Sequence, residues 1–237
     1  MSNIIISLDG NIGSGKSTFI NILKKERPNY HILDEPVANW EKTKDNDGSN
    51  LLEKFYSNQE RWSYTFQNYA YITRLQSLKN AIDDGHKIII SERSIFTDKN
   101  IFASLLYDDN KMSDIEWKIY NSWFDHFKIN MDGFIYINTQ PKICNERILK
   151  RSRTGENNIP IDYLNKLHDK HQSVLCDNHL NFNLELNGDV DFINNLSIQN
   201  SMIEKVDRYI TFLSNKNTMR HETVNSYNVF QQEYNSK

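Results

Sequence analysis

Short runs of apolar residues alternate with longer, partly polar segments along the chain. Residues 4–8, 88–90 and 134–137 are continuous runs of mainly β-branched or aromatic residues. Such runs are typical of strands that are buried on both faces of a parallel sheet. Residues 31–33 and 184–186 are weaker strand candidates. The pattern therefore predicts a parallel five-stranded sheet.

The segments between the predicted strands show helical spacing. It is clearest over residues 59–82, where apolar side chains recur at three- and four-residue steps, at Trp62, Phe66, Tyr69, Ile72, Leu75 and Leu78. Strands that alternate with helices predict an α/β fold with right-handed crossovers. Residues 42–49 are charged and contain Gly48, so we expect a surface loop there. We expect one domain over residues 1–213 and a polar tail over residues 214–237, either disordered or a poorly packed helix.

Composition narrows the class of partner. The 28 Lys and Arg residues against 31 Asp and Glu give a net charge of −3, so there is no overall positive field for a nucleic acid polymer. No apolar run approaches the roughly 20 residues that span a bilayer, and we recognise no signal or transit peptide. We therefore expect a cytoplasmic protein without a membrane partner. Cys144 and Cys176 are too few for a disulfide framework, so we expect reduced thiols.

A glycine-rich motif follows the first predicted strand and precedes a helical segment. The motif, with the residue after it, consists of Gly10, Asn11, Ile12, Gly13, Ser14, Gly15, Lys16, Ser17 and Thr18. Glycines let successive backbone N–H groups turn toward one anion, and a helix N-terminus adds positive potential. The lysine reaches the β- and γ-phosphates and the serine hydroxyl suits Mg²⁺. The alternative is a chance turn, but motif and context agree on binding of a nucleoside triphosphate with Mg²⁺, and they say nothing about the acceptor.

Carboxylates follow two other predicted strands. Glu35 comes after the second strand, with Pro36 fixing the chain behind it, and Glu92 and Arg93 come after the third. Ligands of open α/β sheets bind at the carboxyl ends of the strands. A carboxylate there can take the proton of an acceptor hydroxyl, and an arginine can neutralise the transferring phosphate. Taken alone, each carboxylate could equally be a helix cap or a surface charge.

At this point the sequence resembles the deoxynucleoside kinases, and within them the branch that contains deoxycytidine, deoxyguanosine and deoxyadenosine kinases. The resemblance covers roughly residues 4–192. It rests on residues 10–17, 35–37 with Trp40, 51–56, 60–62, 66–67, 92–96 and 159–164. It implies a P-loop kinase fold with an arginine-rich lid, which phosphorylates the 5′-hydroxyl of a deoxynucleoside with ATP in nucleotide salvage.

The resemblance also implies roles for the residues at the strand ends. Glu35 would take the proton from the sugar 5′-hydroxyl, and Arg93 would hold the reacting oxygens. Glu92 would coordinate Mg²⁺ through water or assist as a base, and the two roles stay open.

The same resemblance implies a nucleoside pocket. Its residues would be Gln67 at the base edge, Tyr56 and Asp162 at the 3′-hydroxyl, and Trp40, Phe66 and Phe102 around the base. The family usually carries Glu at the Asp162 position, and Asp is one methylene shorter. Read from spacing alone, an aromatic stripe on a helix is more often core than pocket.

Two further segments match the family's nucleotide-binding parts. Arg147, Lys150 and Arg151 share one helical face, with Arg153 just beyond, and this resembles the lid that closes over the phosphates. A basic surface face is the alternative. The turn at Asn187, Gly188 and Asp189 resembles the loop that meets the adenine, although Val190 shifts the register of the Asp-Phe pair that follows.

Arg74 lies seven residues, about two helical turns, after Gln67, so both can face one pocket. Arg74 and Asp98 match a polar pair at the base edge in the resembling branch, whereas thymidine-preferring relatives have apolar residues there. Such a pair favours deoxycytidine or a purine deoxynucleoside over thymidine, because buried unpaired polar groups cost about 1–3 kcal/mol each. The residues do not rank the favoured nucleosides.

The family resemblance further implies a homodimer built from helices at residues 59–82 and 115–127. We weigh two other functions: a nucleoside monophosphate kinase of the thymidylate kinase type, and a P-loop protein that binds nucleotide without turnover. A monophosphate kinase needs extra cations for the acceptor's own phosphate, where this chain offers Tyr56, Gln67 and acidic groups. A protein that only binds nucleotide would not need Glu35 and Arg93 at the strand ends.

Overall fold

A central parallel sheet organises the molecule. The computed structural model describes residues 3–151, 159–177 and 183–235. Its strands are β1 (Ile4–Asp9), β2 (His31–Leu33), β3 (Ile88–Glu92), β4 (Gly133–Asn138) and β5 (Asn183–Asn187). They lie in the order β2-β3-β1-β4-β5, and every neighbouring pair is parallel. The predicted five-stranded α/β fold is confirmed.

Helices connect the strands. Their bounds are α1 (Lys16–Glu26), α2 (Val37–Lys42), α3 (Leu51–Ser57), α4 (Gln59–Asp83), α5 (Ile95–Thr97), the π-helical segment η1 (Asp98–Ala103), α6 (Ser104–Asp108), α7 (Asp114–Phe127), α8 (Pro141–Arg151), α9 (Ile161–His171), the second π-helical segment η2 (Gln172–Asp177) and α10 (Leu196–Asn235). The predicted strand and helix bounds agree with these to within two residues at each end, and those of β2 are the same. Between α2 and α3 lies the predicted surface loop, closed by a bridge from Lys44 to Asn50.

The two faces of the sheet carry different helices. On one face, α1 and α10 cover the side chains of Ile4, Ile6 and Leu8. On the other face, α4 packs on Ile5 and Ile89, and η1, α8 and α9 pack around β4. The alternation follows from the strand pleat, since successive side chains of β1 point to opposite faces. The carboxyl ends of all five strands open on the same edge, where the loops gather.

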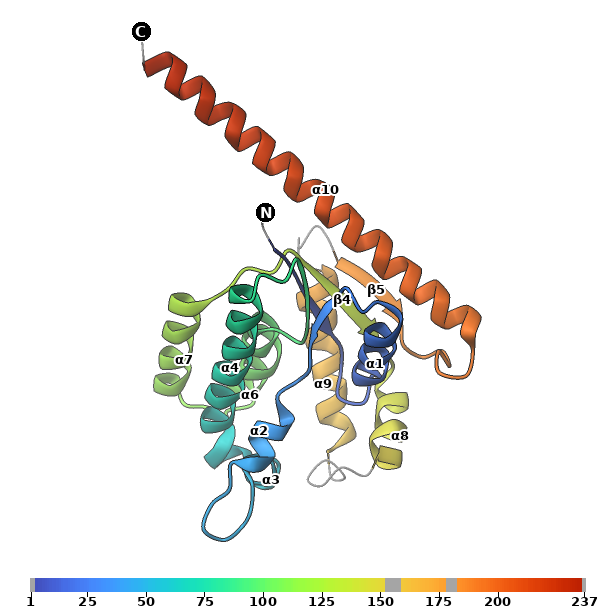
Figure 1. The fold of residues 1–237 in the computed structure, drawn as a ribbon. Helices are drawn as coiled ribbons and strands as arrows, with labels where there is room; N and C mark the ends of the chain where they lie inside the picture. The colour runs from blue at the N-terminus through green and yellow to red at the C-terminus, as the bar shows by residue number, and fades with distance from the viewer. Residues whose placement is uncertain (1–2, 152–158, 178–182, 236–237) are drawn as a thin grey trace.

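The last helix is anchored at one end of the sheet. The side chain of Arg27, after α1, pairs with Asp207 of α10 at 2.6 Å, and the hydroxyl of Tyr30 donates to the same carboxylate at 2.7 Å. Figure 1 shows the C-terminal part of α10 projecting away from the sheet. The helix continues across residue 213, so the boundary between domain and tail stays a prediction. Among the described residues, no helix has the length and apolar character to cross a membrane.

Candidate active site

The phosphate loop joins β1 to α1 at the open edge of the sheet. Its tight path depends on Gly13, which has a backbone φ of +77°, a value that residues with a side chain rarely adopt. A Cβ at Gly13 would lie 2.5 Å from the main-chain oxygen of Cys144 in α8. The loop is therefore pressed against α8, and glycine is required there for both conformation and space.

Lys16 and Asn11 are fixed inside this loop. Lys16 Nζ donates to the carbonyl oxygens of Gly10 and Asn11, at 2.9 and 2.6 Å. Burial, helped by the charge of Arg93, lowers the pKa of Lys16 to about 7. The Asn11 side chain donates to the Leu164 carbonyl at 2.8 Å, so it fastens the loop to α9.

A carboxylate and two arginines meet at the ends of β2 and β3. Glu35 accepts a hydrogen bond from Arg93 Nη1 and lies 3.4 Å from Arg74 Nη2. Burial alone would raise the pKa of Glu35, but Arg93, Arg74 and Lys16 together lower it to about 2. Glu35 is therefore an ionised carboxylate at neutral pH, and its contact with Arg93 was not predicted from the sequence.

The neighbouring carboxylates also have partners. Ser17 Oγ donates to Glu92 Oε1 at 2.8 Å, which brings the two expected Mg²⁺ ligands together. Arg74 Nε donates to Asp98 Oδ2 at 2.7 Å, so the expected polar pair is formed. Burial raises the pKa of Asp98, against the lowering effect of Arg74. Asp98 lies in η1, and π-helical turns are frequent at functional sites.

One cavity of about 710 Å³ connects the phosphate loop with these charged groups. The end of the cavity away from the phosphate loop is aromatic. Trp40 packs edge-on against Phe66 with 5.1 Å between the ring centres, and Phe55 stacks on Phe66 with 4.4 Å between the ring centres. Gln67 and Tyr56 line the same end. The dimensions suit a nucleoside-sized ligand, since such pockets run to about 300–1,000 Å³.

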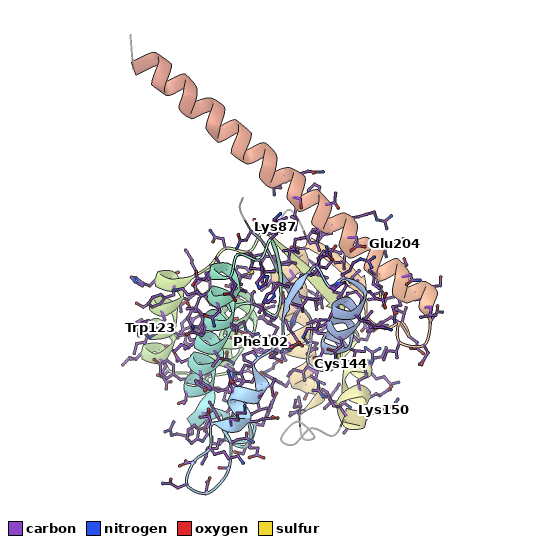
Figure 2. The ribbon with its side chains drawn as sticks, in the orientation of Figure 1. Lys87, Phe102, Trp123, Cys144, Lys150 and Glu204 are labelled. Carbon is purple, nitrogen blue, oxygen red and sulfur yellow. The ribbon has the colours of Figure 1, made fainter. Side chains whose placement is uncertain are left out.

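The basic helix α8 borders the loop end of the cavity. Arg147 donates to the Ser14 carbonyl at 3.0 Å and to the Gly188 carbonyl at 2.9 Å, so it ties the phosphate loop to the turn after β5. Lys150 and Arg151 also line the cavity, and Figure 2 shows Lys150 near the C-terminal end of α8. The expected lid residue Arg153 lies outside the described residues.

Most residues singled out from sequence line this cavity: Ile12, Gly13, Ser14, Gly15, Lys16, Ser17, Thr18, Glu35, Trp40, Tyr56, Phe66, Gln67, Arg74, Glu92, Arg93, Asp98, Phe102, Arg147, Arg151 and Asp189. Gly10, Asn11, Asn187 and Gly188 shape the loops behind it. Asp162 lines a neighbouring hollow of about 500 Å³, whose walls include Tyr56 and Tyr163. Since Tyr56 and Tyr163 also border the main cavity, the two hollows adjoin.

Sequence reasoning missed other residues of the cavity wall. These are Val37, Leu52, Phe55, Ala70, Tyr163 and Ile193. The cavity is also lined by Lys150 of the lid match and by Val190, Asp191 and Phe192 after the adenine turn, which the sequence had indicated. Ala70 lies midway between Phe66 and Arg74 at four-residue steps, so helical spacing was a usable signal for it. Ile193 reaches the site only through the path of the chain after β5, which no local pattern gives.

A phosphate loop at the end of the central strand of a parallel sheet, facing a pocket with paired carboxylates and arginines, defines a P-loop kinase. The deoxynucleoside kinase family model matches residues 6–211. The chain therefore belongs to the deoxynucleoside kinase family and is a phosphotransferase that phosphorylates deoxynucleosides with ATP.

Individual relatives agree with this assignment. The chain is 44% identical over 216 residues to a fowlpox virus protein named as a probable deoxycytidine kinase, with 88% of each chain covered. It is 37% identical over 238 residues to the human deoxycytidine kinase, covering 88% of this chain and 91% of the relative. A mitochondrial deoxyguanosine kinase from Xenopus laevis is 29% identical over 238 residues, covering 88% and 90%.

Proposed function

We propose that the preferred acceptor is deoxycytidine, with purine deoxynucleosides next and thymidine disfavoured. The observation that carries this is the buried Arg74–Asp98 pair, which lines the same cavity as Gln67 and the aromatic side chains. A base whose edge satisfies these donors and acceptors binds well, whereas one that leaves them unpaired is rejected. The relatives named as deoxycytidine kinases support deoxycytidine as the acceptor.

In the proposed reaction Glu35 is the general base. The 5′-oxygen forms a bond to the γ-phosphorus of ATP as the bond to the leaving ADP oxygen breaks, and the proton of the 5′-hydroxyl passes to Glu35. Arg93, which holds Glu35 before substrate arrives, would then stabilise the charge on the transferring group. Lys16, Arg151 and Lys150 would neutralise the phosphates from the loop and from α8.

The acceptor sugar and the donor base have separate proposed contacts. Tyr56 and Asp162 would hold the 3′-hydroxyl from the adjoining walls of the two hollows. The turn at residues 187–189 would meet the adenine, since Asp189 lines the cavity next to Phe192. Arg147 would act on ATP through the loops that it fastens.

Mg²⁺ fits the oxygen donors at the start of α1. Ser17 Oγ and the Glu92 carboxylate, 2.8 Å apart, are hard oxygen ligands of the kind this ion takes together with phosphate oxygens. When bound with ATP, the ion would neutralise charge that develops on the β- and γ-phosphate oxygens.

Purified protein, ATP and Mg²⁺ incubated with each of four deoxynucleosides and their monophosphates tests this proposal. The expected product is deoxycytidine monophosphate, formed with a higher kcat/KM than thymidine monophosphate. Faster phosphorylation of thymidine than of deoxycytidine would overturn the order of acceptors. Turnover of the monophosphates alone would instead favour the thymidylate kinase type of reaction.

We also propose a homodimer in the cytoplasm. Along α4 and α7, Ile72, Ile115 and Trp123 are 57%, 70% and 50% exposed, and Trp123 points outward in Figure 2. Tyr120 and Phe124 of α7 are core residues instead. Light scattering at micromolar concentration should give about twice 28.0 kDa, and the monomer mass would reject the dimer. The free thiols of both cysteines suit a reducing compartment.

A further inference from the structure

Asp9, the last residue of the central strand, is a buried carboxylate that the proposed reaction does not use. Its side chain is 0% exposed, and among the residues that the structure describes no cation lies at hydrogen-bond distance from its oxygens, which have only the hydroxyls of Ser7 and Thr97 nearby. Buried charges are nearly always paired, because an unpaired one keeps the full cost of leaving water. An unpaired carboxylate at this place therefore points to a function.

The pleat of β1 places Asp9 on the face of the sheet that α4, η1, α8 and α9 cover. Leu8 packs in the core under α1 and α10, and side chains alternate along a strand, so Ser7 and Asp9 point the other way. The Leu8 carbonyl accepts a 2.9 Å hydrogen bond from the backbone N–H of Arg93. Asp9 is thus next in the chain to the point where Arg93 is fastened to the sheet.

Two cations of the site act on Asp9. Burial raises the pKa of Asp9 to about 6, while the nearby hydroxyls of Ser7 and Thr97 and the charges of Arg93 and Lys16 lower it. The carboxylate is therefore mostly ionised at pH 7. Its two cationic neighbours repel each other, since Arg93 lowers the pKa of Lys16. A buried negative charge near both offsets this repulsion.

Arg93 is only partly held by the substrate side of the site. Its Nη1 donates to Glu35, and its guanidinium lies 4.6 Å from the centre of the Phe102 ring. Its Nε is buried and has no partner in the described part of the chain. The residue also has φ +60°, a conformation that costs energy for arginine, so its surroundings must hold it in place.

The other carboxylates of the site are already engaged. Glu35 and Asp98 pair with arginines, and Glu92 accepts from the hydroxyl of Ser17. Asp9 differs from them in making no such contact with the described residues. An amide of the same size would fill the same space without the cost of a buried charge, so packing alone does not account for a carboxylate.

We propose that Asp9 is a positioning residue of the phosphoryl-transfer site, whose charge holds Arg93 and Lys16 in place from behind the phosphate loop. It touches neither substrate. It acts by keeping the two cations close to each other and oriented toward the transferring phosphoryl group. Its loss should therefore change the geometry of the transition state more than the affinity for substrate. The inference rests on the deoxynucleoside kinase reaction.

The test compares Asp9→Asn with wild type and with Ser7→Ala, a control on the same buried face of β1. Asp9→Asn should lower kcat about 10- to 100-fold and change the KM for deoxycytidine by less than about 3-fold. Its melting temperature at pH 7.5 should equal or exceed that of wild type, because burial makes ionisation of Asp9 costly in the folded state and Asn carries no charge. Ser7→Ala should keep kcat within about 2-fold of wild type.

Asp9→Glu, which restores the charge, should recover kcat to within about 5-fold of wild type. An Asp9→Asn enzyme that keeps wild-type kcat, or that melts lower and loses kcat in the same proportion as Ser7→Ala, overturns the proposal. So does a folded Asp9→Glu enzyme as slow as Asp9→Asn. If wild type phosphorylates no deoxynucleoside, the proposed function fails first, which separates the two failures.

Should Asp9→Glu not fold, the pH dependence of kcat decides. The wild-type kcat should fall below pH about 6 and that of Asp9→Asn should not. Of the groups around Asp9, Arg93 and Lys16 stay cationic below pH 6, and Tyr136, its neighbour on β4, stays neutral. Buried His171, with a pKa lowered to about 3, stays neutral as well. A fall of the same size in Asp9→Asn would overturn the proposal.

Discussion

Replacing Asp9 by Asn should make the protein more stable at neutral pH although it makes the enzyme slower. Burial raises the pKa of this carboxyl group from 3.8 to about 6. The folded state then binds a proton more tightly than the unfolded chain does, so the free energy of unfolding falls as the pH rises from about 4 to about 6. Below pH about 4 both states are protonated, and the ionised group no longer lowers stability.

The size of the effect follows from the two pKa values. Each pKa unit between the folded and unfolded states corresponds to about 1.36 kcal/mol in the free energy of unfolding. The raise from 3.8 to about 6 therefore lowers the free energy of unfolding by about 3 kcal/mol above pH 6. Asparagine carries no charge at any of these pH values and avoids this loss. For a chain of this length the difference corresponds to roughly 6–12 °C in melting temperature.

Denaturant unfolding of wild type and Asp9→Asn at intervals from pH 4 to pH 8 measures this. The free energy of unfolding of Asp9→Asn should equal that of wild type near pH 4 and exceed it by about 3 kcal/mol at pH 7.5. Ser7→Ala keeps the Asp9 carboxylate but removes a hydroxyl that lowers its pKa, so this variant should become less stable than wild type as the pH rises, the opposite of Asp9→Asn. A difference between Asp9→Asn and wild type that does not vary with pH would refute the reasoning.

Three further substitutions test the site itself. Glu35→Gln should lower kcat about 10²–10⁴-fold while nucleoside binding, followed by tryptophan fluorescence, weakens much less; loss of turnover in Glu92→Gln instead would exchange the two roles. Arg151→Ala should lower kcat more than it raises the nucleoside KM, and a change in affinity alone would contradict a lid role. Gly13→Ala should weaken ATP binding and stability, measured by calorimetry and melting, because its Cβ would meet the main chain of α8. Gly48→Ala, which shares a positive φ but meets no atom within 4 Å, is the control, and equal effects would reject the steric explanation.

The fold was predictable because its signals are local and repeated. Each strand is a short apolar run, and the parallel sheet buries the central strands on both faces, so sequence and structure agree on their positions. The phosphate loop was predictable for the same reason, since all of its residues are contiguous and their spacing sets the turn. The path of the chain after β5, which brings Ile193 to the cavity, has no such local signal.

The pairing of charges in the site could be predicted only in part. Seven-residue spacing placed Arg74 and Gln67 on one face of a helix, and the structure has both at the cavity. The contact of Arg93 with Glu35 joins residues 58 positions apart and depends on the order of β2 and β3 in the sheet. No periodicity encodes that distance, so the tertiary fold had to supply it.

Asp9 shows why a residue next to a recognised motif escaped notice. The apolar pattern ends the first strand at Leu8, because a carboxylate is normally exposed and reads as the start of a loop. In the folded protein β1 is the middle strand, and it continues through Asp9 with β4 alongside, which takes this carboxylate out of water. A residue that departs from what its local sequence predicts, without an evident compensating contact, is expected to have a functional role. Here the local prediction fails at a carboxylate whose pKa is raised by burial and lowered in part by Arg93 and Lys16, the two cations that we propose for phosphoryl transfer.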